Sequence, residues 1–493
     1  MAITRRQFLA RTCVATAGTV LGPSFFGNPF LQRAMAATIG NRYLVVLFLD
    51  GGNDGFNTVV PYENGTLRTA YAANRKTGNG GLRLQQGDLD GSSLGTAGTL
   101  IGDDPNTGAQ LALHPGFRGL PGLSAGAGGL KAIYDAGELA VIQGCGYPSY
   151  SLSHDESRTI WQTANPFRLG PYTGTGWVGR VLADPSQMYS GGDIPGVNIE
   201  SNVAPEFRQT ATSVLAINRL RAFGFPYDGD YSGDDNDKEA AFSALYAAAQ
   251  SGSLSYIANS GLATLASTNS YPPLHGHYES ARGTFSDLYD GIDRGTARDL
   301  REIAKIIYGI ETGVPGVAAH FFRLSNGGYD THSDQGAADS DGQHFQLHGE
   351  VGAALKVFRD DLADMGAWDR TCVLVYSEFS RRIPQNDNGT DHGSQGPMFI
   401  LGGGVNGGVY GNHPNVNDLD DDENTQYRQD AYGGFRSTDF RDVYGTVLKH
   451  WVNMAPATVA ALLPLDTGNA ATRWTVANFD VKRPTDNANL FAP

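Results

Sequence analysis

The feature that most constrains the fold is an apolar run near the start of the chain, "RYLVVLFLDGG" (Arg42–Gly52), which ends at a pair of glycines. A strand with one solvated face alternates apolar and polar residues, but this run has no polar position between Tyr43 and Leu49. Such a continuous run is typical of a strand buried on both faces of a parallel sheet.

Four later segments have the same character, and a helical pattern separates two of them. The segment Phe345–Met365 carries apolar residues at helical spacing and lies between the third and fourth runs, which gives the order strand, helix, strand. The sequence therefore predicts an α/β fold with a mainly parallel sheet covered by helices on both faces. The four further runs are Leu139–Gly146, Val317–Ser325, Cys372–Phe379 and Met398–Gly404.

Residues 227–294 differ in composition from the rest of the chain. Their central part, Lys238–Ser267, is rich in alanine and is typical of helices. We interpret residues 227–294 as a helical cap inserted into a single α/β domain of residues 37–493.

The first 36 residues predict an export signal. The segment "TRRQFL" (Thr4–Leu9) contains paired arginines, a short apolar stretch follows, and "AMA" (Ala34–Ala36) is typical of a cleavage site, so the mature chain starts at Ala37. A membrane anchor is the alternative, but the stretch is shorter than the ~20 residues needed to span a bilayer. We therefore expect the twin-arginine translocase to export a folded protein to the periplasm or beyond, with no membrane span in the mature protein. This route is often used when a metal is inserted before export.

Charge and cysteine content exclude several classes of protein. Without the four arginines of residues 1–36, 32 Lys+Arg stand against 51 Asp+Glu, a net charge of −19, which disfavours nucleic acid or an anionic membrane surface as a partner. Of the three cysteines, Cys145 and Cys372 remain in the mature chain, and we expect buried free thiols, with one disulfide between them as the alternative. The acidic run Asn417–Asn424 is interpreted as a solvated surface loop.

Chemically active side chains gather where the predicted strands end. Ligands bind beyond the carboxyl ends of strands in such sheets. Carboxylates brought together without a cation repel one another, whereas mixed oxygen and nitrogen ligands suit a divalent metal. We therefore predict a centre of one or two divalent metal ions, which can be zinc, manganese, iron, magnesium or calcium. The candidate ligands are Asp50, Asp54, Asp330, His332, Glu378, Asp391 and His392.

Each candidate also has a structural interpretation. Asp54 and Asp330 lie in glycine-rich turns, where aspartate commonly caps the backbone. Glu378 is close to Arg381 and Arg382, which can form a structural ion pair with it, and His332 can be a hydrogen-bonded loop residue. Their joint position at predicted strand ends favours the metal centre.

The wording of several motifs resembles a known family. The motifs are "LFLDGGNDGFNTVVPY", "LHPGF", "GYPSYSLSHDESRTIWQTA", "GWVGR", "GGYDTHSDQ", "VYSEFSRR", "GTDHGSQGPMFILGGGVNGGVYG" and "STDFRDVY". Together they resemble the bacterial exported family called domain of unknown function 1501, over nearly the whole mature chain. That family is similar to a distant branch of the alkaline phosphatase and sulfatase superfamily, which implies an α/β fold with metal at the strand ends.

The resemblance implies a role for each candidate ligand. Asp50 or Asp54 would be the first ligand, and Asp330 with His332 would replace an Asp-x-x-x-His pair, although the spacing here is Asp-x-His. Glu378 would be the ligand at a strand end. His392 would be the late histidine of the superfamily, with Asp391 either ligating the metal or orienting His392.

The superfamily also implies a nucleophile at the start of a helix, where free N–H groups stabilise an anion. Ser153 is the first candidate and Ser151 the second. A capping box between Ser153 and Glu156 is the alternative explanation of the serine. Arg158, one helical turn later, is a candidate to hold the anionic group. Arg381 is a second candidate for this role, and His114 and His154 are candidate extra ligands.

These features together predict an exported, metal-dependent hydrolase acting on an anionic phosphate or sulfate ester. The alternative is a non-catalytic exported protein that keeps the fold and the metal for stability and serves as a binding or envelope-associated factor. The chain has no Cys-x-Pro-x-Arg segment, so the formylglycine chemistry of most sulfatases is not supported.

Overall fold

The computed structural model describes most of the chain. The described residues are 39–147, 150–187, 189, 193–209, 212–224, 235–249, 254–338, 341–414, 438–464 and 479–492. The predicted export signal (residues 1–36) and the acidic run Asn417–Asn424 lie outside these ranges. Among the described helices, none has the length and apolar character needed to cross a bilayer.

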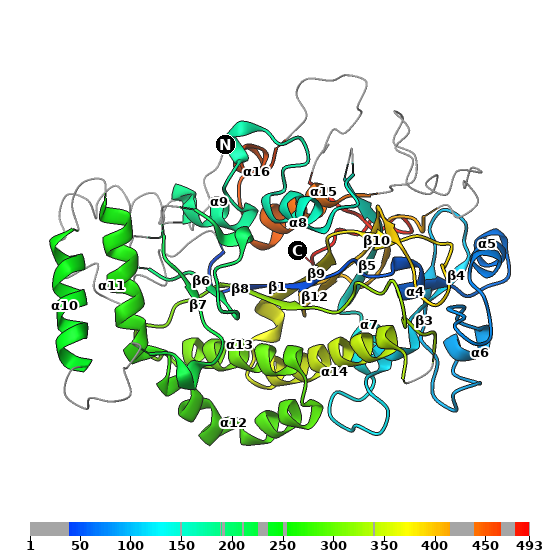
Figure 1. Cartoon of the computed structure of the whole chain (residues 1–493), viewed down its shortest axis with the longest axis horizontal. Helices are drawn as coiled ribbons and strands as arrows, with labels where there is room; N and C mark the ends of the chain where they lie inside the picture. The colour runs from blue at the N-terminus through cyan, green and yellow to red at the C-terminus, as the bar shows by residue number, and fades with distance from the viewer. Residues whose placement is uncertain are drawn as a thin grey trace, which may run out of the picture.

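A nine-stranded sheet forms the centre of the fold (Figure 1), and all five predicted runs supply one of its strands. Its neighbours are parallel except at β12, which runs antiparallel to both β5 and β9. The predicted α/β architecture with a mostly parallel sheet is confirmed. In spatial order the strands are β13 (Gly408–Tyr410), β5 (Leu139–Gly146), β12 (Gly396–Leu401), β9 (Thr371–Ser377), β1 (Tyr43–Leu49), β8 (Phe321–Asn326), β6 (Gly196–Asn198) and β7 (Val214–Ala216), and β14 (Thr438–Asp439) also pairs with β5.

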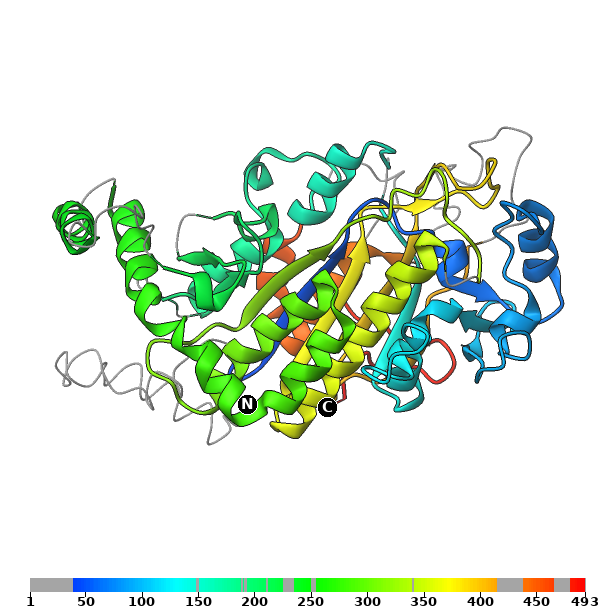
Figure 2. The same cartoon turned by 60° about the horizontal axis from the view of Figure 1, so that its bottom comes forward.

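Helices cover both faces of the sheet, which explains the absence of polar positions in β1. Val45 and Leu47 of β1 pack in the core on one face, and Leu44 and Val46 pack in the core on the other. Figure 2 shows the helices of the first face lying across the sheet. The first layer contains α7 (Gly129–Asp135), α12 (Pro273–Ile292), α13 (Gly295–Glu311) and α14 (Gln343–Asp364), and the second contains α8 (His154–Thr163), α9 (Trp177–Ala183), α15 (Phe440–Thr446) and α16 (Pro456–Leu462).

The predicted helical insertion divides into two parts. The helices α10 (Asp235–Ala248) and α11 (Ser255–Ser270) stand at one end of the molecule, to the left in Figure 1. Helix α12 instead packs against α14, where Arg282 donates to the buried carboxylate of Asp361 at 2.6 Å. The last part of residues 227–294 therefore belongs to the helix layer under the sheet.

Two small sheets lie beside the large one. A three-stranded sheet of β2 (Val59–Pro61), β4 (Gln110–Leu113) and β3 (Leu100–Asp103) lies near α4 (Gly55–Thr58), α5 (Thr66–Asn74) and α6 (Gln86–Leu89). The second is a short antiparallel pair, β10 (Ser380–Arg381) and β11 (His392–Gly393), in which Arg381 lies opposite His392. This pairing fixes the loop that carries His392 close to the carboxyl end of β9.

The two remaining cysteines take the predicted state. Cys145 in β5 and Cys372 in β9 are both buried and free. Burial raises the pKa of both thiols, so neither forms a reactive thiolate near neutral pH. The prediction of buried free thiols is confirmed, and the alternative of a disulfide is not.

Candidate metal centre

The direction of β12 decides which loops meet at the carboxyl edge of the sheet. The segments after β1, β8 and β9 reach this edge because these strands are parallel. Asp391 and His392 precede β12, and in an all-parallel sheet they would lie at the opposite edge. Since β12 is antiparallel to β9, its amino end lies beside the carboxyl end of β9.

Three imidazole rings and one carboxylate converge at this edge. The Nε2 atom of His392 lies 2.9 Å from Nε2 of His332 and 3.1 Å from Nε2 of His154. Asp330 Oδ1 lies 3.2 Å from His332 Nε2, and Asp330 Oδ2 lies 3.5 Å from His154 Nε2. Ligand atoms of His154, Asp330 and His392 all lie within 4.8 Å of one another, and His332 adjoins this group.

The other nitrogen of each ring faces a hydrogen-bond acceptor. Nδ1 lies 2.8 Å from Glu378 Oε1 in His154, 3.2 Å from Asp391 Oδ1 in His332 and 2.7 Å from the carbonyl oxygen of Leu152 in His392. These acceptors assign the proton to Nδ1, which leaves each Nε2 with a bare lone pair. Three lone pairs at such separations repel one another unless a cation lies between them.

The arrangement fits a transition metal or zinc. Tetrahedral zinc sites have bonds of roughly 2.0–2.2 Å, which place ligand atoms about 3.3 Å apart. Neighbouring donor atoms here are separated by 2.9 to 3.5 Å, and His332 lies outside the group of His154, Asp330 and His392, whose ligand atoms are all within 4.8 Å of one another. Imidazole nitrogens with one carboxylate suit zinc, manganese or iron, whereas magnesium and calcium prefer oxygen ligands throughout.

The surroundings of His392 and Asp330 favour the protonation states that a cation site requires. Burial lowers the pKa of His392, and the charge of Arg381 acts in the same direction, so the ring is neutral near pH 7. Burial opposes ionisation of Asp330, but the hydrogen bond and charge of Arg381 outweigh it and lower the carboxyl pKa. Neither group must lose a proton before it binds a cation.

Arg381 joins the loops that carry these ligands. Its side chain is fully buried and donates to the carbonyl oxygens of Gly52 and Thr390, both at 2.8 Å, and to Asp330 Oδ1. The sequence made Arg381 a candidate to hold a substrate anion, and this interpretation is wrong because its donors are used within the protein. The loop also needs glycine at position 51, where φ is +123° and a Cβ atom would lie 2.4 Å from the backbone nitrogen of Asp330.

Glu378 and Asp391 hold histidine rings at Nδ1, on the side away from the converging Nε2 atoms. Glu378 is fully buried and accepts from the backbone N–H of Gly51 and from His154. Asp391 contacts His332, whereas the sequence assigned it to His392. Carboxylates in this position fix the ring and its tautomer in metal sites. Both carboxylates therefore contact the Nδ1 side of a ring and not the converging Nε2 atoms, and the prediction of Glu378 as a direct ligand stays a prediction.

The two aspartates after β1 have different surroundings. Asp54 is fully buried, caps α4 through the N–H of Phe56, and forms an ion pair with Arg75 at 2.9 Å. Its carboxylate oxygens stabilise the local fold, as the turn-capping interpretation expects, and are not part of the candidate metal centre. Asp50 instead pairs with Arg158 at 2.8 Å, and burial together with the charge of Glu378 raises its pKa.

The hydroxyl of Ser153, at the start of α8, does not cap the helix. Ser153 occupies the N-cap position, but its side chain makes no capping hydrogen bond, so the expected capping box with Glu156 does not form. Ser151 donates to Glu156 at 2.8 Å and accepts from the N–H of Ser153. Arg158 lies one turn later, and its side chain is 33% exposed beside Asp50 and Glu378.

His114 belongs to a different group of histidines. Its Nδ1 accepts from the N–H of Gly116 at 3.0 Å, and its Nε2 lies 3.2 Å from the carbonyl oxygen of Ala337. Its ring packs against the buried rings of His344 and His348 of α14, with ring centroids 5.1 and 5.0 Å away. The candidate role of His114 as an extra ligand of the predicted centre is therefore wrong.

This buried group predicts acid sensitivity. Burial, aided by the charges of Arg75 and Arg381, lowers the pKa of His344 to about 3. Between about pH 6.5 and 3 only the unfolded chain takes up this proton, so stability is complete above pH 6.5 and is lost as the pH falls through that window. Each such group steepens the dependence by about 1.4 kcal/mol per pH unit.

Urea unfolding of the protein between pH 7 and 5 measures this slope. We expect His344→Gln to reduce the pH dependence of the free energy of unfolding by about 1.4 kcal/mol per pH unit. His277→Gln is the matched control, because His277 is exposed and contacts Thr312. Equal slopes for His344→Gln and the unaltered protein would contradict the prediction.

A family model matches a segment that contains part of the candidate metal centre. Residues 310–429 match the family model described as "Protein of unknown function (DUF1501)". The predicted resemblance is confirmed over this span, which contains Asp330, His332, Glu378 and His392. No curated protein and no solved structure matches the chain.

The DUF1501 segment supplies two of the three histidines, and the third comes from outside it. His154 was only a secondary candidate from the sequence, yet it lies 238 residues from His392 and contacts it directly. Its position directly after Ser153, at the first residue of α8, was the available signal. That signal was weak because a histidine beside a serine has no fixed meaning without the fold.

Proposed function

We propose that this protein is a metal-dependent hydrolase that cleaves a phosphate or sulfate ester. The observation that carries the proposal is the convergence of three Nε2 atoms and the Asp330 carboxylate, with each ring fixed through Nδ1. The DUF1501 resemblance to the alkaline phosphatase and sulfatase superfamily supports the same chemistry, and so does the position of the centre at the strand ends of an α/β fold.

In this proposal His154, His332, His392 and Asp330 hold a divalent zinc, manganese or iron ion. A cation held there would supply Lewis acidity toward an oxygen of the ester. Glu378 keeps the lone pair of His154 directed into the centre, because its carboxylate accepts the Nδ1 proton.

The start of α8 supplies the nucleophile and the anion contacts. The Ser153 oxygen forms a bond to phosphorus or sulfur as the ester bond to the alcohol breaks, and the hydroxyl proton goes to the departing alcohol. Water then cleaves the bond to the serine, which releases phosphate or sulfate and restores the hydroxyl. The free N–H groups of the first turn of α8 favour a negative group at this position. Arg158, which is partly exposed one turn later, places a positive charge close by.

Metal analysis of the exported protein, together with a panel of chromogenic esters, tests the proposal. We expect bound zinc, manganese or iron and hydrolysis of a phosphate or sulfate ester that a chelator removes and the same metal restores. Bound metal without hydrolysis of any ester would support the alternative, in which the metal stabilises a non-catalytic exported protein.

We also propose export through the twin-arginine translocase, which rests on residues 1–36 alone. Replacing Arg5 and Arg6 with lysine is expected to trap the precursor in the cytoplasm, because the pathway reads the arginine pair and not only its charge. Cell fractionation with immunodetection measures this. Arg11→Lys is the control, and normal amounts of exported mature protein in the double variant would refute the proposal.

A further inference from the structure

A second chemically distinct site lies away from the metal centre, between α12, α13 and the 3-10 helix η5 (Leu220–Ala222). The cavity encloses about 460 Å³. Small-molecule sites commonly occupy roughly 300–1,000 Å³. The cavity lies toward the β7 end of the sheet, because η5 directly follows that edge strand.

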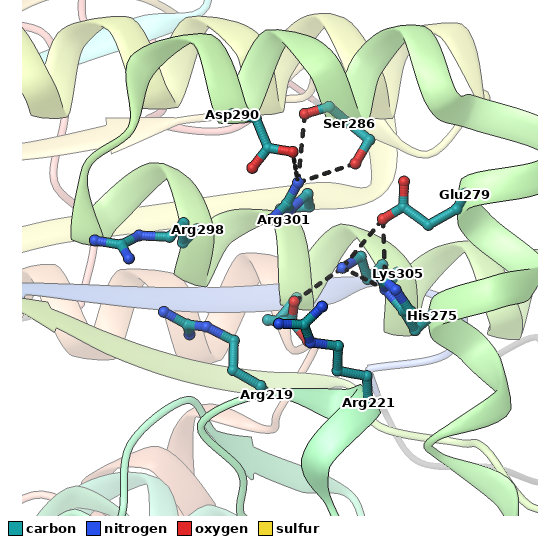
Figure 3. Close-up of a pocket in the computed structure, with 10 residues that line it drawn as sticks. Arg219, Arg221, His275, Glu279, Ser286, Asp290, Arg298, Arg301 and Lys305 are labelled. Carbon is teal, nitrogen blue, oxygen red and sulfur yellow. Dashed lines mark hydrogen bonds and ion pairs between the residues drawn. The ribbon is translucent and has the colours of Figure 1, made fainter.

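Cationic side chains from two elements face this cavity. Arg298, Arg301 and Lys305 follow one face of α13 at spacings of three and four residues. Figure 3 shows Arg219 and Arg221 extending toward α13 from the segment below it. The cavity therefore has basic groups on two sides in a protein whose net charge is −15.

Two of the cations on α13 are held by the cavity wall. Lys305 is almost fully buried, donates to Glu302 at 2.9 Å and lies 3.4 Å from Glu279. Arg301 pairs with Asp290 at 2.6 Å. The pairs of Lys305 with Glu279 and of Arg301 with Asp290, which are drawn in Figure 3, join α13 to α12 at the cavity wall.

The remaining arginines differ in their partners. Arg219 pairs with Asp299 at 2.7 Å. In the described part of the chain neither Arg221 nor Arg298 has a carboxylate partner, and no dashed line reaches either of them in Figure 3. His275 does not change the charge of the cavity, since burial and the neighbouring Lys305 lower its pKa and keep the ring neutral. Both guanidinium groups are exposed at the cavity, and Arg298 also lies in the electrostatic field of Asp299, which pairs with Arg219.

We propose that this cavity binds a small organic anion through Arg221 and Arg298. The planar guanidinium group donates two parallel hydrogen bonds to a phosphate, sulfate or carboxylate group, and it stays charged at any physiological pH. The volume exceeds what a single inorganic oxyanion fills, so the ligand carries an organic part that contacts the wall near Ser286. The site is independent of the proposed hydrolase, since it shares no residue with the metal centre.

Calorimetric titration of the mature protein with phosphate, sulfate and citrate tests the proposal and distinguishes the oxyanions. We expect citrate, the organic anion of the three, to bind at one site per chain and more tightly than phosphate or sulfate. Arg221→Gln with Arg298→Gln should weaken that binding by about 10- to 100-fold, as expected for lost hydrogen bonds to a charged group. The bound metal of this double variant should stay unchanged.

A control variant makes the result decisive. Arg294→Gln with Lys482→Gln removes two exposed cations that do not line the cavity, and it should keep the affinity of the unaltered protein. The proposal is overturned if citrate does not bind at millimolar concentration or binds no more tightly than phosphate and sulfate, if the cavity variant binds normally, or if the control variant loses as much affinity as the cavity variant.

Discussion

His392→Ala is expected to remove the bound metal and to lower the melting temperature of the protein. His392 is the central ring, with its Nε2 atom 2.9 and 3.1 Å from those of His332 and His154. Metal binding free energy is also folding free energy when the unfolded chain lacks the site. With free metal at a thousand times its dissociation constant this contribution is about 4 kcal/mol.

Elemental analysis and scanning calorimetry, each with and without a chelator, measure the two effects. The chelator should lower the melting temperature of the unaltered protein and leave that of His392→Ala unchanged, which separates metal loss from simple loss of packing. His277→Ala serves as the control, because His277 is exposed, contacts Thr312 and is far in sequence from every predicted ligand. An unchanged metal content in His392→Ala would show that the cluster is only a hydrogen-bonded loop.

Ser153→Ala is expected to reduce ester hydrolysis by about a thousandfold or more while the metal stays bound. The serine lies at the start of α8, next to His154, and its hydroxyl makes no capping bond that the fold would lose. The contrast with His392→Ala therefore separates a nucleophile from a ligand. The measurement is the turnover of the best ester, together with metal content and melting temperature.

Ser151→Ala is the matched control for that experiment. Its hydroxyl is engaged by Glu156 and by the N–H of Ser153, so its loss should affect turnover far less than the loss of Ser153. The assignment of the nucleophile moves to Ser151 if the two results are reversed. Full activity in both variants would exclude a serine nucleophile at this helix.

Local sequence patterns were sufficient for the layers of the fold. Continuous apolar runs predicted five strands of the sheet because a strand buried on both faces has no solvated position, and each run forms a strand within a few residues of its predicted bounds. The short strands β6 and β7, at one end of the sheet, were not predicted. They have three residues each, too few for a periodic pattern to be visible.

The predicted strand ends also indicated which segments form the candidate metal centre, but they did not show the role of each side chain. Asp330, His332 and His392 do meet, as their positions indicated. Glu378 and Asp391 contact Nδ1 atoms instead of the converging Nε2 atoms, and Asp54 pairs with Arg75. A carboxylate has the same sequence context whether it binds a metal or orients a ligand. The two roles differ only by a few ångströms in how distant segments approach one another.

The α/β class, five strands and the loops that carry reactive groups were predictable from the chain alone, since they follow from the local periodicity of apolar residues. The antiparallel direction of β12, which brings His392 to the carboxyl edge, and the placement of His154 beside it by α8 were visible only in the folded protein. The fold also places Arg221 and Arg298 at one cavity. Strand direction, helix placement and ion pairing depend on contacts between residues far apart in the chain, and no local pattern encodes them.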